Sequence, residues 1–159
     1  VSSGEPHKNH LRLLEAWSIL AKEGLKPTLA LTLGPSNNKL IKAVEKLQND
    51  EGVLVYNLKI MERDQLLELF TKSKALIFPS LGESFGLPLI EAQQLNLPIL
   101  APELDYVRDV CTPVQTFDPL SSLSIVRAVK RFLGQHDSNI TPYSAEEFWS
   151  MLGIFTEKS

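Results

Sequence analysis

Short apolar segments recur at nearly even spacing along this chain, and this rhythm constrains the fold more than any other feature. Four such segments begin at residues 28, 53, 75 and 98, so successive starts are 25, 22 and 23 residues apart. The segments between them carry apolar residues at helical spacing, for example Leu40, Ala43, Val44 and Leu47. This spacing is typical of a repeated unit in which a strand is followed by a crossover helix and then by a parallel strand. The sequence therefore predicts an α/β fold with a parallel sheet.

The expected sheet has about six strands. Residues 114–117 provide a fifth apolar segment, and Val1 to Ser3 read as the end of another strand, so we expect a longer gene product. Six strands form a doubly wound, Rossmann-like sheet of order 3-2-1-4-5-6, with helices on both faces. We assign residues 1–134 to this domain. Residues 135–159 are expected to be a linker and a C-terminal helix, which packs on this domain or on a missing N-terminal domain.

Composition excludes several classes of protein. The 159 residues suit one domain. A net charge of -3 offers no positive field for nucleic acid. The longest apolar run has four residues, far short of the roughly 20 that span a bilayer. The single cysteine, Cys111, cannot form an internal disulfide, so we expect a cytoplasmic protein.

Two polar loops are expected to face each other across one crevice. In a sheet of this order, ligands bind beyond the carboxyl ends of the strands where the order reverses, between the first and fourth strands. The loop after the first strand carries Lys8, and the loop after the fourth carries Glu83, Ser84 and Gly86 before a helix. A helix start and a mobile cation both favour phosphate. Glu91, about one turn into that helix, could accept hydrogen bonds from a diol. These residues predict a site for a phosphorylated ligand.

The residues of this loop also resemble a known family. The segment Glu83 to Ala92 resembles the Glu-x7-Glu signature of retaining glycosyltransferases of the GT-B fold, family 4 in particular. Glu5 to His10 resembles that family's Lys-Asn segment, at the start of its C-terminal domain. Residues 75–80 and 97–101 resemble the strands on either side of the signature. The resemblance covers about residues 1–134, a whole nucleotide-sugar-binding domain.

The resemblance implies a role for each matching residue. Lys8 and the backbone amides of Phe85, Gly86 and Leu87 would hold the diphosphate of the donor. Lys8 would also assist catalysis by stabilising the charge that grows on the leaving group.

The two glutamates would act on other parts of the donor. Glu83 would meet the sugar hydroxyls and be the second catalytic residue, and Glu91 would hold the ribose. The family's usual arginine is Ser2 here, and its usual glycine after the first glutamate is Ser84.

The resemblance also implies substrates and partners. The donor would be a nucleoside-diphosphate sugar, and the acceptor a glycan or a lipid. No cofactor is expected. We expect no metal, because His7 and His10 have no third ligand at a useful spacing. The full-length protein would be an enzyme able to associate with the cytoplasmic face of a membrane, whereas this domain alone would be inactive.

Two other functions fit parts of the sequence. Gly82 to Gly86 also match Gly-x-Ser-x-Gly, the nucleophile elbow of α/β-hydrolases, with Ser84 as nucleophile and Asp118 and His136 in triad order. Against this, Pro79 and Ser80 separate the strand from the glycine. The other alternative is a nucleotide-binding module without catalysis.

Overall fold

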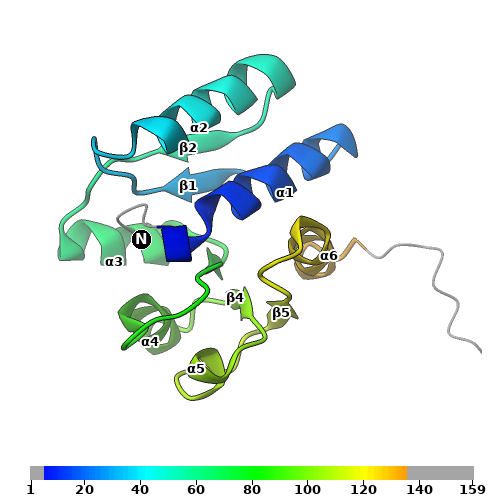
Figure 1. Ribbon diagram of the computed structural model, residues 1–159. Coiled ribbons are helices and arrows are strands. Elements are labelled where there is room, and N and C mark those ends of the chain that lie inside the picture. Colours follow the sequence, from blue (N-terminus) through cyan, green and yellow to red (C-terminus); the bar gives the residue numbers. More distant parts are fainter. Residues whose placement is uncertain (1–5, 136–159) are drawn as a thin grey trace, which may run out of the picture.

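The computed structural model describes residues 6–135. Strands and helices alternate along these residues (Figure 1). The strands are β1 (Leu29–Leu31), β2 (Val55–Asn57), β3 (Leu76–Ile77), β4 (Ile99–Pro102) and β5 (Gln115–Phe117). A 3-10 turn, η1 (Pro6–Lys8), precedes the helices α1 (His10–Lys22), α2 (Asn38–Glu51), α3 (Arg63–Lys72), α4 (Leu87–Gln94), α5 (Asp105–Arg108) and α6 (Ser122–Phe132). All paired strands are parallel. The predicted α/β fold is confirmed.

The described strands form two sheets rather than one. β1 pairs with β2, and β3, β4 and β5 pair in that order. Both sets of pairs agree with the predicted strand order. In that order, the strand expected at Val1 to Ser3 has β1 on one side and β3 on the other. That segment lies outside the described residues, and so do the helix expected near residues 143–155 and most of the 135–159 tail.

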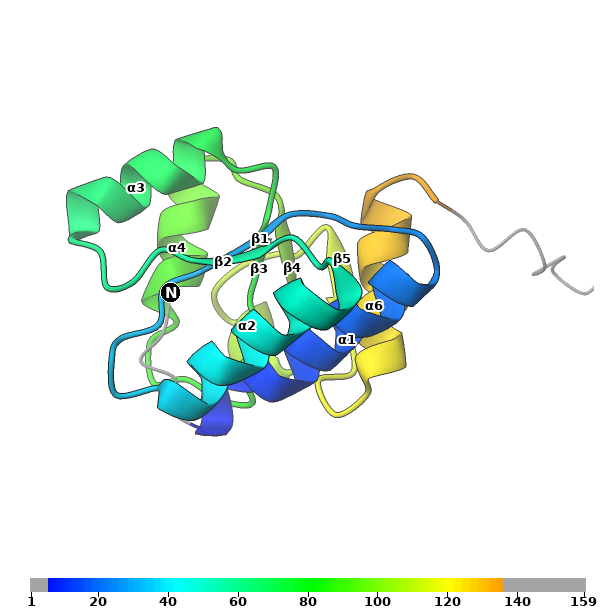
Figure 2. The same cartoon turned by 90° about the horizontal axis from the view of Figure 1, so that it is seen from above.

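Two hydrophobic cores cover the two faces of the strands. Residues from α1, α2 and α6 build one core, and residues from α3, α4 and α5 build the other. β4 serves both, because Leu100 belongs to the first core while Ile99 and Ala101 belong to the second. Figure 2 shows α1, α2 and α6 grouped together, with α3 and α4 apart from them. The domain is doubly wound, as predicted.

The strands are shorter than the apolar segments that predicted them. β1 ends at Leu31 because the Leu33 amide donates to Asn57 Oδ1 (2.9 Å), a side chain rather than a neighbouring backbone. β2 begins only at Val55, since the Val53 amide donates to the carbonyl oxygen of Leu47 (3.3 Å) and so closes the end of α2. Local side-chain and helix-end bonds therefore replace part of the ladder.

Candidate functional site: a lysine, two glutamates and a helix start

The expected meeting of two loops is present in the structure. Lys8, at the end of η1, donates from Nζ to Glu83 Oε1 (2.7 Å) and Oε2 (2.9 Å), in the loop between β3 and α4. Only 16% of the Lys8 side chain and 12% of the Glu83 side chain are exposed. The strand order thus brings together two of the residues that the sequence singled out.

Glu83 is held in its charged form. Burial alone would raise its pKa, but hydrogen bonds from Lys8 and Ser80, together with the charges of Lys8 and His7, outweigh burial and lower the pKa below its ordinary value of 4.5. Near neutral pH this site therefore contains a carboxylate and an ammonium group in direct contact.

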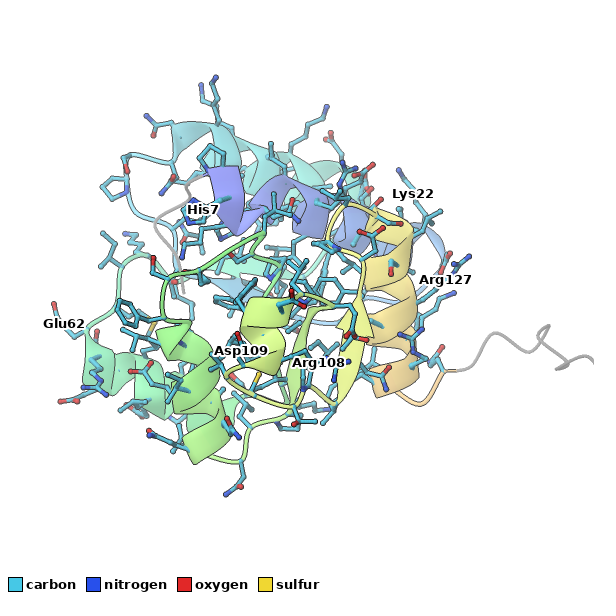
Figure 3. All side chains as sticks on the ribbon, turned by 60° about the horizontal axis from the view of Figure 1, so that its bottom comes forward. His7, Lys22, Glu62, Arg108, Asp109 and Arg127 are labelled. Carbon is cyan, nitrogen blue, oxygen red and sulfur yellow. The ribbon has the colours of Figure 1, made fainter. Side chains whose placement is uncertain are left out.

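Backbone and side-chain bonds fix the loop that carries Glu83. The Leu81 amide donates to the carbonyl oxygen of His7 (2.8 Å), and Figure 3 labels His7 on η1. The Ser80 side chain is buried, and its Oγ lies within hydrogen-bond distance of the carbonyl oxygens of Gly82 (3.1 Å) and His7 (3.3 Å). Tyr106 donates from its hydroxyl to the Ser80 carbonyl oxygen (2.7 Å). The η1 turn, the loop after β3 and α5 are thereby joined at one point.

Asn9 performs a positioning role that the sequence analysis did not assign. It adopts a left-handed backbone conformation (φ 58°), which asparagine tolerates better than most residues. Its Nδ2 donates to the carbonyl oxygens of Pro79 (3.2 Å) and Pro119 (2.7 Å). One side chain therefore ties the start of α1 to the segments that follow β3 and β5.

The start of α4 presents unpaired amide groups. Gly86, the residue before the helix, is left-handed (φ 61°). In the described part of the chain, no hydrogen-bond acceptor is found for the amides of Phe85, Gly86 or Leu87. Pro88 follows and has no amide hydrogen, and the Leu89 amide donates to the Gly86 carbonyl oxygen (2.9 Å). The three amides that the sequence singled out are the free donors of this helix start, which suits an anion.

The structure does not bring Glu91 into contact with Lys8 or Glu83. Glu91 Oε1 instead accepts from Arg63 Nε (3.1 Å), and the two side chains are 12% and 75% exposed. Arg63 is the first residue of α3, and nothing in the sequence pattern marked it. The contact shows that the start of α3 lies beside the second glutamate.

The geometry contradicts the hydrolase alternative. Ser84 is an exposed loop residue seven positions after the end of β3, whereas a nucleophile elbow turns directly from strand to helix. Asp118 uses its Oδ1 to accept from the Leu120 amide (2.9 Å). His136, the third expected member, lies outside the described residues.

Within residues 6–135, no helix is long and apolar enough to cross a membrane. The same range holds no cluster of three or more His, Cys, Asp or Glu side chains suited to a metal ion.

The parallel strands, with helices on both faces and this polar cluster beyond the strand ends, define a Rossmann-like domain. Residues 1–140 match the family "Glycosyl transferases group 1", and the chain belongs to this family.

Curated relatives include mannosyltransferases. "Serotype-specific mannosyltransferase WbdA" of Escherichia coli is 31% identical over 152 residues, which are 94% of this chain and 18% of that protein. "O-antigen chain mannosyltransferase RfbU" of Salmonella typhimurium is 25% identical over 103 residues, covering 60% of this chain and 29% of that protein. The chain thus spans less than a third of the length of these relatives.

Solved structures share the fold at low identity. Sucrose-phosphate synthase from Thermosynechococcus elongatus has a TM-score of 0.69 at 20% identity, over 84% of this chain and 35% of that chain. The catalytic domain of cholesterol-alpha-glucosyltransferase from Helicobacter pylori has a TM-score of 0.68 at 18% identity, over 84% and 83%. WaaG, described as a glycosyltransferase involved in lipopolysaccharide biosynthesis, has a TM-score of 0.62 at 22% identity, over 85% and 37%. The GT-B type of fold is confirmed.

Proposed function

We propose that this chain is the donor-binding domain of a retaining, family 4 glycosyltransferase. The whole protein would move a sugar from a nucleoside-diphosphate sugar to an acceptor glycan or lipid. The observation that carries the proposal is the Lys8–Glu83 pair beside the open start of α4. Phe85 is two residues from Glu83, so their Cα atoms are at most about 7 Å apart. The cation, the carboxylate and the free amides therefore lie within the reach of one donor.

The cationic side of the site suits the diphosphate. The amides of Phe85, Gly86 and Leu87 would bind phosphate oxygens, and the Lys8 ammonium would neutralise the negative charge that grows as the bond from sugar to diphosphate breaks. Lys8 and the helix start would thus stabilise the diphosphate charge that a metal ion stabilises in other enzymes. We therefore propose that donor binding does not require a metal.

The two glutamates would bind the hydroxyl groups of the donor. Glu83 is charged and shielded, so its oxygens can accept hydrogen bonds from the sugar once Lys8 turns toward the diphosphate. Glu91 would accept from the ribose hydroxyls, in competition with Arg63. Donor binding would thus exchange two internal ion pairs for contacts with the ligand.

The relatives support a sugar and a setting for the reaction. Two of them are named as mannosyltransferases, one of them as acting on O-antigen chains, so we propose mannose as the sugar and a glycan or lipid-linked glycan as acceptor. Transfer would take place in a cleft between this domain and an N-terminal domain of the same protein. We place that protein in the cytoplasm, where it can reach lipid-linked acceptors at the membrane face.

Two measurements test the proposal. Glu91→Ala should weaken GDP or UDP binding to this chain about 10- to 100-fold, because hydrogen bonds to a charged group contribute about 1.5 to 3 kcal/mol. Inorganic pyrophosphate, which has no ribose, should bind both proteins equally. Calorimetric titration of both ligands, with and without EDTA, decides this. Equal losses for GDP and pyrophosphate would contradict the ribose role.

The second measurement concerns turnover. The chain alone should bind donor but release no nucleotide in response to an acceptor, since one half of a cleft can neither position the acceptor nor exclude water. A coupled assay for nucleoside diphosphate release, with GDP-mannose and UDP-sugars, checks this. Acceptor-dependent turnover by this chain would show that the second domain is not needed.

A further inference from the structure

Arg63, the first residue of α3, carries a charge that the helix does not need. A positive side chain is disfavoured at a helix start, because the positive end of the helix dipole lies there. The start of α3 is stabilised by other residues, since the Glu62 amide donates to Gln65 Oε1 (3.0 Å). Figure 3 labels Glu62 at the outer rim of the domain. The stability of α3 therefore does not explain an arginine at this position.

The ion pair with Glu91 explains Arg63 only in part. The side chain of Arg63 is 75% exposed, and an ion pair with so exposed a partner contributes little to stability. The pair uses Nε of Arg63 alone. In the described part of the chain, no partner is found for its two terminal nitrogens, Nη1 and Nη2. A planar group with free donors thus lies in solvent beside a shielded carboxylate.

The position of Arg63 places it beside a bound nucleoside. Glu91 is the residue that would hold the ribose under the proposed function, on which this inference rests. A ribose hydroxyl bound to Glu91 lies about 3 Å from its carboxylate, and Arg63 Nε lies 3.1 Å from the same group. The base of a nucleotide is attached to the ribose carbon next to the one that bears the 2′-hydroxyl. A nucleotide held in this way brings its base within the reach of Arg63.

An exposed apolar side chain lies near the same helix start. Ile60 is 72% exposed and precedes Arg63 by three residues, so their Cα atoms are at most about 11 Å apart. It follows the end of β2, and a Cβ on Gly34, in the loop after β1, would meet Ile60 Cδ1 at 3.0 Å. An apolar surface and a planar cation at this spacing suit a flat aromatic ring.

We propose that Arg63 is a specificity-determining residue that selects guanine as the base of the donor nucleotide. Guanine presents two neighbouring acceptors, O6 and N7, and the two terminal nitrogens of an arginine bind both at once. Adenine presents an amino group, a donor, in place of O6, and uracil presents a single acceptor, O4. Guanine is therefore the base that uses both free nitrogens of Arg63.

The direction of one effect separates this role from simple competition for Glu91. An arginine that only blocks Glu91 weakens the binding of every nucleotide, so its removal would strengthen binding of all of them. An arginine that moves from Glu91 to the base strengthens the binding of guanine nucleotides, so its removal would weaken binding of these alone.

Calorimetric titration of this chain with GDP, ADP, UDP and inorganic pyrophosphate tests the proposal. The parent chain should prefer GDP, and Arg63→Ala should weaken GDP binding about 5- to 150-fold relative to UDP binding, the discrimination that one bidentate arginine gives. Arg63→Lys keeps the charge but lacks the paired nitrogens, so it should lose the preference for GDP as well. Pyrophosphate, which has no base, should bind all three proteins equally. Arg127→Ala, which removes an exposed arginine of α6 (Figure 3), is the matched control and should bind like the parent chain.

Several results would overturn the proposal while leaving the donor-site assignment intact, because nucleotides would still bind. These are stronger GDP binding by Arg63→Ala, a change by the same factor for GDP and UDP, and a parent chain or Arg63→Lys variant that contradicts the expected preference. Failure of the parent chain to bind any nucleoside diphosphate would instead contradict the proposed function, and this inference with it.

Discussion

Lys8 Nζ and Glu83 Oε1 lie 2.7 Å apart although 75 residues separate them in the chain. Both side chains are shielded, and the free amides of Phe85 to Leu87 follow within two to four residues of Glu83. The Glu83 carboxylate therefore neutralises the Lys8 cation, which under the proposed function would bind the diphosphate.

Glu83→Gln should destabilise the fold at pH 7 by about 1 to 3 kcal/mol, because it leaves a shielded Lys8 without its charged partner. The pKa of Glu83 is lowered in the folded state, so the pair contributes fully above the ordinary value of 4.5 and is lost as pH falls through the lower folded value. The difference from the parent chain should thus shrink below about pH 4. Urea unfolding at several pH values measures it.

The control for this variant is Glu68→Gln. Glu68 forms a comparable contact with Lys72 (2.6 Å), but both side chains are mostly exposed. This substitution should leave the urea midpoint nearly unchanged. Equal effects of the two substitutions would show that burial of the Lys8–Glu83 pair is unimportant.

His10 should make the fold acid-sensitive. Burial, reinforced by the charge of Lys8, lowers the pKa of His10 from 6.5 to about 4. The unfolded chain then binds the proton first, so stability should fall by about 3 kcal/mol as pH drops from 6.5 to 4. His10→Gln should flatten this part of the pH profile in urea unfolding. An NMR titration of His10 with a midpoint near 6.5 would contradict the prediction.

Gly86→Ala should cost about 1 to 2 kcal/mol, because alanine is disfavoured at φ 61°. It should also weaken nucleoside diphosphate binding, since the start of α4 must shift to relieve the strain. Gly82→Ala is the control: a Cβ there meets nothing within 4 Å, and the backbone is not left-handed. Thermal unfolding and calorimetry of both variants check this, and similar losses at the two positions would refute it.

Tyr106→Phe should loosen the loop that carries Glu83. The substitution removes the hydroxyl that donates to Ser80 and leaves a buried carbonyl oxygen unpaired, at a cost of about 1 to 2 kcal/mol. Hydrogen exchange of residues 80–84 should increase. Tyr56→Phe, on an exposed tyrosine of β2, should change neither stability nor exchange. Unchanged exchange in Tyr106→Phe would show that the loop holds its position without α5.

The sequence predicted the fold and the meeting of Lys8 with Glu83 for the same reason. The even spacing of the apolar segments indicated parallel strands in a doubly wound order. That order determines which loops meet at the carboxyl ends of the strands. It could not predict Asn9 as a link between two loops, because that role depends on where residues 79 and 119 lie in space. Nor could it predict the Arg63–Glu91 pair, since no periodicity relates the start of α3 to α4. Strand ends were missed where a side chain, such as Asn57, took the place of a backbone partner.

The central claim is that Lys8 binds the diphosphate of a donor, and calorimetric titration of this chain with GDP, UDP and the matching nucleosides tests it most directly. Lys8→Ala should weaken binding of one nucleoside diphosphate about 10- to 100-fold, which corresponds to about 1.5 to 3 kcal/mol, and leave nucleoside binding unchanged. Lys22→Ala, on an exposed lysine with only a 3.8 Å contact to Glu51, should bind like the parent chain. Equal losses for nucleoside and nucleoside diphosphate, or no binding of any nucleoside diphosphate by the parent chain, would contradict the claim.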